Sequence, residues 1–294
     1  MKTRIITAAV LLPVFFVILF ILPPIVLAIV VSIISGIAAY ELLHATKISV
    51  NKSVLIYTII SASLVPLAVN LASVPSPAHV NLYAAMLLIT LLLSIFFIFI
   101  SLLAIEAVLT MKNAKAIEKG TQLKFRQIPI ALAAGILIPY MLSSVVSLKS
   151  MQYGHLLVLL PVVATILTDS GAYFTGITIG KKKAFPTISP NKTVEGYIGG
   201  TIAGIIAMMI YGVILLYTTS LTVIFPILIL YGILGAVMTE LGDLVFSFIK
   251  RKCGIKDYGK LIPGHGGALD RFDSLIFCGP TMYLLVIFLP AVYR

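Results

Sequence analysis

The sequence predicts an all-α integral membrane protein with about nine transmembrane helices. Of its 294 residues, 60% are hydrophobic and only 11% are charged, and the mean hydropathy is +1.14. So little polar surface excludes a soluble globular domain. Apolar runs of roughly 20 residues, the length that crosses a bilayer as a helix, recur along the chain. Runs such as LLLSIFFIFISLLAI show no period of two, which excludes a β-barrel.

Polar breaks and Pro or Gly residues divide the chain into the predicted spans. These cover residues 5–22, 24–44, 54–72, 82–105, 128–147, 155–179, 194–217, 222–249 and 274–292. The first is interpreted as a retained helix rather than a cleaved signal peptide, because apolar character continues beyond Pro23 and Pro24. Most acidic residues follow residue 168. We therefore predict an N-terminal transmembrane scaffold (1–150) and a C-terminal transmembrane catalytic region (151–294).

The 21 Lys and Arg residues predict how the spans are oriented. With a cytoplasmic N-terminus, all of them except Lys149 and Arg294 lie in cytoplasmic segments, as the positive-inside rule requires. The C-terminus then lies on the opposite side. The expected location is the inner (cytoplasmic) membrane, with the functional site facing the cytoplasm. Because these loops account for the net charge of +11, no nucleic-acid partner is expected. Cys253 and Cys278 lack the spacing of a zinc site or a disulfide framework.

Carboxylates inside the predicted spans are candidates for function, since a bare carboxylate in a bilayer costs several kcal/mol. Asp169 follows an apolar run, and Glu240, Asp243 and Ser247 share one helix face at positions i, i+3 and i+7. Such a face attracts a cation. The alternatives are that neighbouring hydroxyl groups satisfy Asp169 and that Glu240 merely extends towards the membrane surface near a helix end.

The segment after the eighth span, SFIKRKCGIKDYGKLIPGHGGALDRFD, combines glycines with basic side chains and two carboxylates at helical spacing. Glycines let the backbone approach a ligand closely, and a helix N-terminus nearby favours phosphate binding. The predicted phosphate-binding residues here are Lys250, Arg251, Lys256, Lys260, Gly266, Gly267 and Arg271. His265 is either a general base or a residue that only hydrogen-bonds to backbone or phosphate.

A metal ion explains why acidic and basic residues occur together in this segment. Carboxylates without a His or Cys cluster suit Mg²⁺ rather than zinc. We predict that Asp243, Asp270 and Asp273 hold the catalytic metal or metals, with Asp169 on the wall of the same cavity. A second cation, if present, is either K⁺ or a divalent ion.

The segment GKKKAFPTISPNKTVEGYIGG adds further cations ahead of the seventh span. Ser189 is the predicted helix N-cap and Pro190 the first helical residue, which places Lys192 in the first turn. A first turn normally prefers acidic residues, so Lys192 is expected to bind an anion, and Ser189 is predicted to bind the same cofactor. Gly196, Gly200 and Gly204 recur every four residues, which predicts close helix packing.

Residues 247–273 resemble the signature of the phosphatidate cytidylyltransferase (CDP-diacylglycerol synthase) family. The matching residues are Ser247, Lys250-Arg251, Lys256-Asp257, Pro263, His265-Gly266-Gly267, Asp270-Arg271 and Asp273. Ala268 departs from the pattern, since the family usually has a larger aliphatic residue there. The segments Asp169–Tyr173 and Ser189–Gly196 are similar to the same family, so the resemblance covers roughly residues 165–290.

This resemblance implies a Mg²⁺-dependent transfer of CMP from CTP to phosphatidate, giving CDP-diacylglycerol and pyrophosphate for phospholipid synthesis. The expected partners are CTP, phosphatidate and the lipid bilayer, and a homodimer is left open. Two alternatives use related chemistry: a CDP-archaeol synthase and a polyprenol kinase. A cation-coupled transporter would also place acidic residues in the membrane, but it leaves the Lys-rich and Gly-rich loops unexplained.

Overall fold

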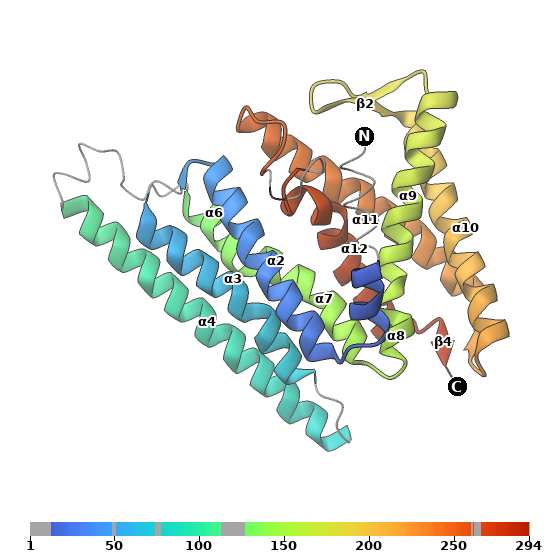
Figure 1. Ribbon diagram of the computed structural model, residues 1–294, viewed down its shortest axis with the longest axis horizontal. Coiled ribbons are helices and arrows are strands. Elements are labelled where there is room, and N and C mark those ends of the chain that lie inside the picture. The colour runs from blue at the N-terminus through green and yellow to red at the C-terminus, as the bar shows by residue number, and fades with distance from the viewer. Residues whose placement is uncertain are drawn as a thin grey trace. The chain divides into compact units, whose positions relative to one another are not determined.

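The computed structural model describes residues 13–48, 51–73, 78–112, 127–259, 261 and 266–293, with the side chains of 78–87 and 109–112 excepted. Within these ranges most residues are helical (Figure 1), and eight helical segments are long and apolar enough to cross a membrane. The predicted all-α membrane fold is therefore confirmed. Residues 5–12 of the predicted first span lie outside the described residues, and its residues 13–20 are helical. The orientation of the termini stays a prediction.

The chain forms two compact units. The first contains Met1–His155 and Ile255–Arg271, and the second contains Leu156–Gly254 and Phe272–Arg294. The loop after the eighth predicted span therefore packs within the first unit, although it follows residues of the second in sequence. The assignment of a scaffold role to 1–150 and a catalytic role to 151–294 stays a prediction.

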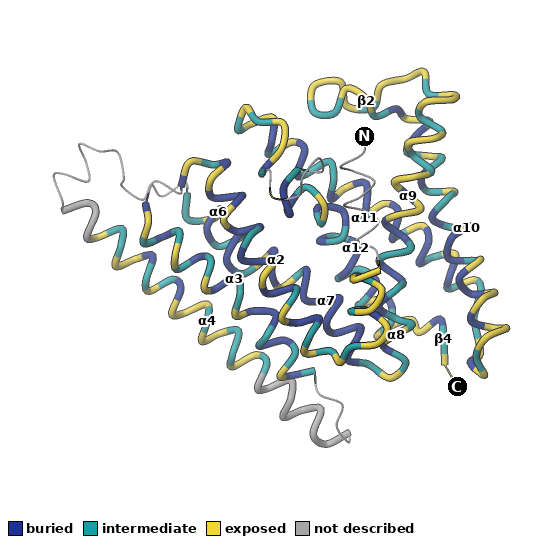
Figure 2. The backbone as a smooth tube through the Cα atoms, in the orientation of Figure 1, coloured by how far each residue is buried: buried dark blue, intermediate teal, exposed yellow. Residues whose placement is uncertain are grey.

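Long helices build the first unit. They are α2 (Pro24–Ala45), α3 (Lys52–Ala72), α4 (Ala78–Lys112) and a composite segment of α6 (Ile128–Leu132), η3 (Ala133–Leu137) and α7 (Ile138–Ser150). Helix α3 packs against α2, α4 and α7. Exposed residues follow one side of α4 (Figure 2) and include Ile89, Leu93 and Phe97. An apolar exposed face is what a helix in contact with lipid requires.

The composite segment contains one wide turn, η3, for a physical reason. Pro139 has no N–H group, so it cannot donate to the carbonyl of Gly135 four residues earlier. The Gly135 carbonyl instead accepts a hydrogen bond of 3.1 Å from the hydroxyl group of Ser61 in α3. A π-type turn in an α-helix accommodates such an interruption. The span predicted at 128–147 is thus confirmed as continuous, with a local defect that the sequence pattern did not indicate.

The second unit contains helices and two short strand pairs. The helices are α8 (Gly154–Leu157), α9 (Leu159–Thr178), α10 (Val194–Thr218), α11 (Phe225–Lys252) and α12 (Leu269–Phe288), the last starting in the first unit. Strands β1 (Lys183–Phe185) and β2 (Ser189–Thr193) form an antiparallel hairpin, and β3 (Thr222–Val223) pairs with β4 (Val292–Tyr293). Helix α10 packs against α9 and α11, and α9 also contacts α11 (Figure 1). These three helices and the hairpin frame the site.

The glycines of α10 allow this close packing. A Cβ atom on Gly200 would lie 3.0 Å from the carbonyl oxygen of Thr168 and 2.7 Å from Oε1 of Glu240. A Cβ atom on Gly204 would lie 3.2 Å from the Cβ of Ala236. These contacts leave almost no room for an added methyl group, so the predicted small-residue seam is confirmed.

The predicted start of α10 was wrong. Ser189 is not an N-cap, because it begins strand β2 and pairs with Phe185 of β1. The N-cap is Thr193, whose hydroxyl oxygen accepts a 3.0 Å hydrogen bond from the Gly196 amide. The pairing with β1 assigns Ser189 to a strand, and a local capping pattern cannot indicate such a pairing. Lys192 therefore precedes the helix instead of lying in its first turn.

Candidate active site

A cavity of about 500 Å³ lies within the second unit, beside α9, α10, α11 and the hairpin. Its volume is typical of small-molecule sites. The polar residues on its wall are Asp169, Tyr173, Lys183, Asn191, Lys192, Thr193, Tyr197, Glu240 and Asp243. Asp169, Lys192 and Asp243, three of the predicted site residues, thus surround one space.

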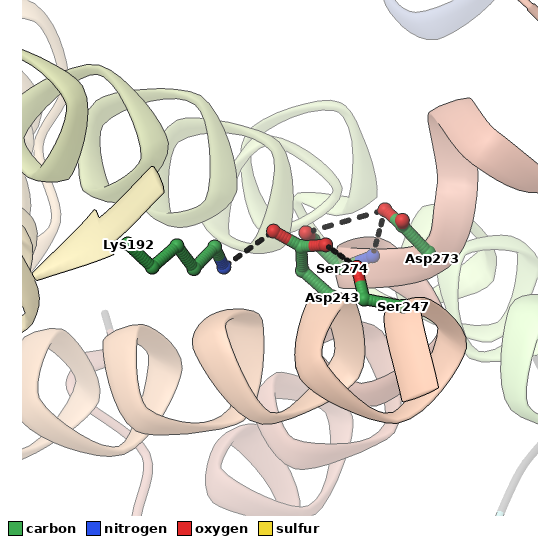
Figure 3. A network of polar contacts seen from close by, with 5 residues as sticks. All are labelled: Lys192, Asp243, Ser247, Asp273 and Ser274. Atoms are coloured by element: carbon green, nitrogen blue, oxygen red, sulfur yellow. Dashed lines mark hydrogen bonds and ion pairs between the residues drawn. The ribbon is translucent and has the colours of Figure 1, made fainter. Parts of the chain in front are cut away.

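Lys192 and Asp243 form an ion pair at the cavity wall (Figure 3). Asp243 also accepts a 3.0 Å hydrogen bond from the hydroxyl group of Ser247, one turn further along α11. The ammonium group of Lys192 also lies 5.4 Å from the ring centroid of Tyr197, in cation–π contact. The helix face predicted from Asp243 and Ser247 is confirmed, and a lysine from β2 is its partner.

The surroundings of Lys192 keep it charged. Partial burial of the ammonium group disfavours the charge, but attraction to Asp243 and the hydrogen bond between them outweigh burial, so the pKa of Lys192 lies above its ordinary value. Electrostatic attraction to Tyr197 and Asp169 raises the pKa of Lys192 further. Lys192 is therefore a permanent cation at neutral pH.

Asp273 lies near this pair, on α12. Its side chain is 8% exposed, and Oδ1 accepts a hydrogen bond of 2.7 Å from the backbone amide of Ser274 (Figure 3). Asp169, Asp243 and Asp273 are close enough to repel one another electrostatically. Lys250, which is buried near the end of α11, attracts Asp273. Three helices thus bring three carboxylates into one neighbourhood.

The donor chemistry of this neighbourhood fits a hard cation. Four carboxylates, those of Asp169, Glu240, Asp243 and Asp273, face two ammonium groups, those of Lys192 and Lys250. An excess of carboxylate oxygens attracts Mg²⁺ or a similar ion. Among the residues that the structure describes, however, no three acidic, His or Cys side chains already form a group able to hold an ion. The metal assignment therefore stays a prediction.

Asp270, the fourth predicted metal ligand, is engaged with the loop of the first unit. Its Oδ2 atom accepts hydrogen bonds from the backbone amides of Tyr258, at 2.8 Å, and Gly267, at 3.1 Å. Helix α12 begins at Leu269, earlier than the predicted span at 274, so Asp270 and Asp273 lie in its first turns. Their helical spacing is confirmed. One carboxylate oxygen of Asp270 is occupied by hydrogen bonds from two backbone amides of the loop.

The other predicted phosphate-binding residues fall into several environments. His265 and Lys260 lie outside the described residues. Lys256 and Arg271 are exposed, and Gly266 has a φ of +90°, a conformation that favours glycine. In the second unit, Nε of Arg251 donates a 3.2 Å hydrogen bond to the carbonyl of Ile188, next to Ser189 in the hairpin. These residues belong to both units, and their joint action on phosphate stays a prediction.

Several residues on the cavity wall were not predicted as site residues from the sequence, and these are Tyr173, Asn191 and Tyr197. Outside the cavity, in the first unit, the carboxylate of Glu41 accepts hydrogen bonds from the loop amides, which was not predicted either. Tyr197 had no distinguishing signal, because a tyrosine near a helix start is common in membrane proteins. Glu41 had one: it is an acidic residue inside an apolar span, the same signal that identified Asp169.

Comparison with known proteins identifies related chains. Over 185 residues the chain is 37% identical to the phosphatidate cytidylyltransferase of Bacillus subtilis (63% of this chain, 67% of that protein). It is 46% identical over 121 residues to the phosphatidate cytidylyltransferase of Staphylococcus saprophyticus, and 42% identical over 121 residues to that of Staphylococcus aureus strain COL. Each of these two matches covers 41% of this chain and 45% of the relative, less than half of its length.

The match to a family model is more extensive. The model of the cytidylyltransferase family matches residues 2–289, which is nearly the whole chain. The family predicted from residues 247–273 is therefore confirmed. The helices of the structure, long and apolar enough to cross a membrane, make the chain an integral membrane protein. The chain belongs to the cytidylyltransferase family and is a nucleotidyltransferase.

Proposed function

We propose that this chain transfers the cytidylyl group of CTP to phosphatidate, forming CDP-diacylglycerol and releasing pyrophosphate. The observation that carries this proposal is the cavity of the second unit, where Lys192 and Asp243 pair beside Asp169. A cation and several carboxylates on one wall suit a triphosphate with a bound metal ion. The names of the related bacterial proteins support the choice of lipid substrate.

The transfer itself needs positioning and charge neutralisation more than covalent chemistry. An oxygen of the phosphatidate phosphate forms a bond to the α-phosphorus of CTP, and the bond from that phosphorus to the bridging oxygen of the β-phosphate breaks. Pyrophosphate leaves with the electron pair of that bond. Lys192, held charged by its surroundings, attracts the negative oxygens of the reacting phosphates.

The carboxylates have a different role, because alone they would repel a triphosphate. Asp243 and Asp273, with Asp169 beside them, would hold Mg²⁺, and Asp270 completes the predicted set. A bound Mg²⁺ ion supplies neutralisation of phosphate charge. Ser247 orients Asp243 by donating a hydrogen bond to its Oδ1 atom.

The membrane location fits a lipid substrate. Asp169 and Glu240 lie on helices that are apolar enough to cross a bilayer, where the headgroup of phosphatidate is accessible. We propose further that the site faces the cytoplasm of the inner membrane, since the basic loops require that orientation. CTP then reaches the site from the aqueous side, and the lipid enters from the bilayer.

Two labelled forms of CTP test the reaction with purified protein in detergent containing phosphatidate. With CTP labelled at the α-phosphate, the label should appear in the lipid extract. With CTP labelled at the γ-phosphate, the label should stay in the aqueous phase as pyrophosphate. Transfer of γ-label to lipid would indicate a kinase, and no transfer of either label would exclude cytidylyl transfer.

A further inference from the structure

Glu41 is a buried acid of the first unit, in the second half of the otherwise apolar helix α2. It is only 3% exposed. Its two carboxylate oxygens accept hydrogen bonds from consecutive backbone amides, those of Ala268 at 3.0 Å and Leu269 at 2.8 Å. The acceptor is thus distant in sequence from both donors. A carboxylate buried this deeply is tolerated because two amides satisfy it.

The amides that Glu41 binds lie at the start of α12. The first turn of a helix has amide groups without partners in the helix itself, and it favours negative charge. Phosphate binding near this helix N-terminus is what the sequence predicts. The amides of Ala268 and Leu269 donate instead to the carboxylate of Glu41, so the anion at this helix start is a side chain of the protein itself.

Glu41 acts together with Asp270. Asp270 accepts hydrogen bonds from the amides of Tyr258 and Gly267, so two carboxylates organise four backbone amides of one loop. The two acids are also close enough to repel each other. The amides therefore hold together two groups that would otherwise separate, and loss of either acid should loosen the loop.

Two glycines make room for Glu41. A Cβ atom on Gly267 would lie 2.6 Å from both carboxylate oxygens of Glu41, and one on Gly259 would also collide with them. Gly259, before the Pro-Gly-His-Gly-Gly segment, and Gly267, its last residue, thus have a packing reason: they allow the carboxylate of α2 to reach the loop backbone.

We propose that Glu41 is a positioning residue for cytidylyl transfer, which fixes the start of α12 and with it the carboxylate of Asp270. The proposal rests on the function proposed above. Asp273 follows Asp270 by three residues in the same continuous helix, so a shift of the first turn moves both. Glu41 itself does not touch substrate; it acts through the loop amides and Asp270.

The test compares Glu41→Gln with Glu106→Gln. Gln keeps the size of Glu and one acceptor oxygen but loses the charge and the second acceptor. Glu106 is the matched control, since it lies in the same unit, on an apolar helix, and its carboxylate accepts a 3.0 Å hydrogen bond from the side chain of Asn51. For each variant, kcat and KM are measured per folded molecule, and amide hydrogen exchange is measured for the 255–271 loop.

Glu41→Gln should lower kcat about 10- to 100-fold, the effect of a slightly misplaced catalytic group, with KM for CTP changed less than threefold. The amides of Ala268 and Leu269 should exchange faster, while Glu106→Gln leaves both kcat and exchange near wild type. If Glu41→Gln does not fold, Glu41→Asp keeps the charge with a shorter reach and should show the same two changes in weaker form.

Wild-type kcat per folded molecule in the folded Glu41 variant would overturn the positioning role, even if its Tm falls, because a purely structural residue changes stability alone. Unchanged exchange of the two amides would also overturn it. Failure of the proposed function looks different: the wild-type protein itself gives no labelled lipid, while the exchange measurement still reports whether Glu41 holds the loop.

Discussion

Lys192 of β2 and Asp243 of α11 form an ion pair at the wall of the cavity, and each is about one quarter exposed (25% and 27%). Such a pair is accessible to a ligand and is not sealed inside the protein. An incoming phosphate can therefore attract Lys192, and a cation can attract Asp243. This relationship is the basis of the first predictions.

Replacing Lys192 with Ala should reduce activity strongly without unfolding the protein. The variant loses the cation that we expect to hold phosphate, so the KM for CTP rises or kcat falls by at least about tenfold, as for a lost charge-assisted contact. Steady-state kinetics with CTP and phosphatidate measure the change. Lys182→Ala is the control, because Lys182 is an exposed lysine immediately before β1 and is not on the cavity wall. Unchanged kinetics would remove Lys192 from the site.

Lys192 should lose its proton only at strongly alkaline pH. Its folded-state pKa is raised above the ordinary lysine value of about 10.4, so the ion pair contributes its full stabilisation below that pH and loses it as pH rises through the folded-state pKa. Neutral amines react with acylating reagents and ammonium groups do not. Mass spectrometry after acylation across pH should give a reactivity midpoint for Lys192 above about 10.4. A midpoint below this value would contradict the assigned surroundings.

Removal of charge from the aspartates should abolish most activity without unfolding the protein, and Asp270→Asn should also loosen the loop amides that its carboxylate binds. Asp243→Asn, Asp270→Asn and Asp273→Asn each keep side-chain size but weaken the predicted metal site, so rates at saturating Mg²⁺ should fall by orders of magnitude. A chelator should likewise abolish the activity of the wild-type protein, and added Mg²⁺ should restore it.

The control for these variants is again Glu106→Gln, which removes a carboxylate from the first unit. Rates near wild type for both Asp270→Asn and Asp273→Asn would contradict the metal assignment. Assays with Mg²⁺, Mn²⁺, Ca²⁺ and K⁺, alone and combined, would identify the ions that support the reaction.

A methyl group on Gly200 should destabilise the second unit. It would lie 2.7 Å from Glu240 and 3.0 Å from Thr168, and such overpacking typically costs about 1–3 kcal/mol. Gly200→Ala should therefore lower the Tm in detergent. Gly176→Ala is the matched change in α9, where the added Cβ meets only the hydroxyl oxygen of Thr193, at 3.3 Å. Its Tm should stay equal or rise, because Ala is the better helix former. Equal changes in Tm for Gly200→Ala and Gly176→Ala would contradict close packing of α10 through its glycines.

Single cysteines test the orientation in a background without Cys253 and Cys278. Lys183→Cys in the hairpin should react with a membrane-impermeant thiol reagent only from the cytoplasmic side, as the charge distribution predicts. Ser220→Cys should react only from the other side, since α10 (Val194–Thr218) lies between the two positions and can cross the bilayer. Both positions are exposed. Labelling of Lys183→Cys from outside only would reverse the topology.

Most of the fold could be predicted from composition and local pattern. A bilayer requires long apolar helices, and the spans predicted from 24 to 72 and from 194 to 217 agree with α2, α3 and α10 within about two residues. The π-type turn at Ala133–Leu137 could not be predicted from local pattern. Pro139 has no amide to donate to the Gly135 carbonyl, and the hydroxyl group of Ser61, in another helix, donates to that carbonyl instead. The hairpin also required a partner strand, which local capping signals do not specify.

The sequence by itself determined the family and the membrane location. It also indicated which acidic residues are candidates for function, because a charged group in an apolar helix is rare. Only the tertiary structure decided the partners of those residues. Lys192 meets Asp243 because the β1–β2 pairing carries it to α11, and Glu41 meets Ala268 and Leu269 because α2 packs beside the start of α12 within the first unit. Hydrogen bonds and ion pairs depend on distances in space, and residues far apart in sequence acquire those distances only when the helices pack.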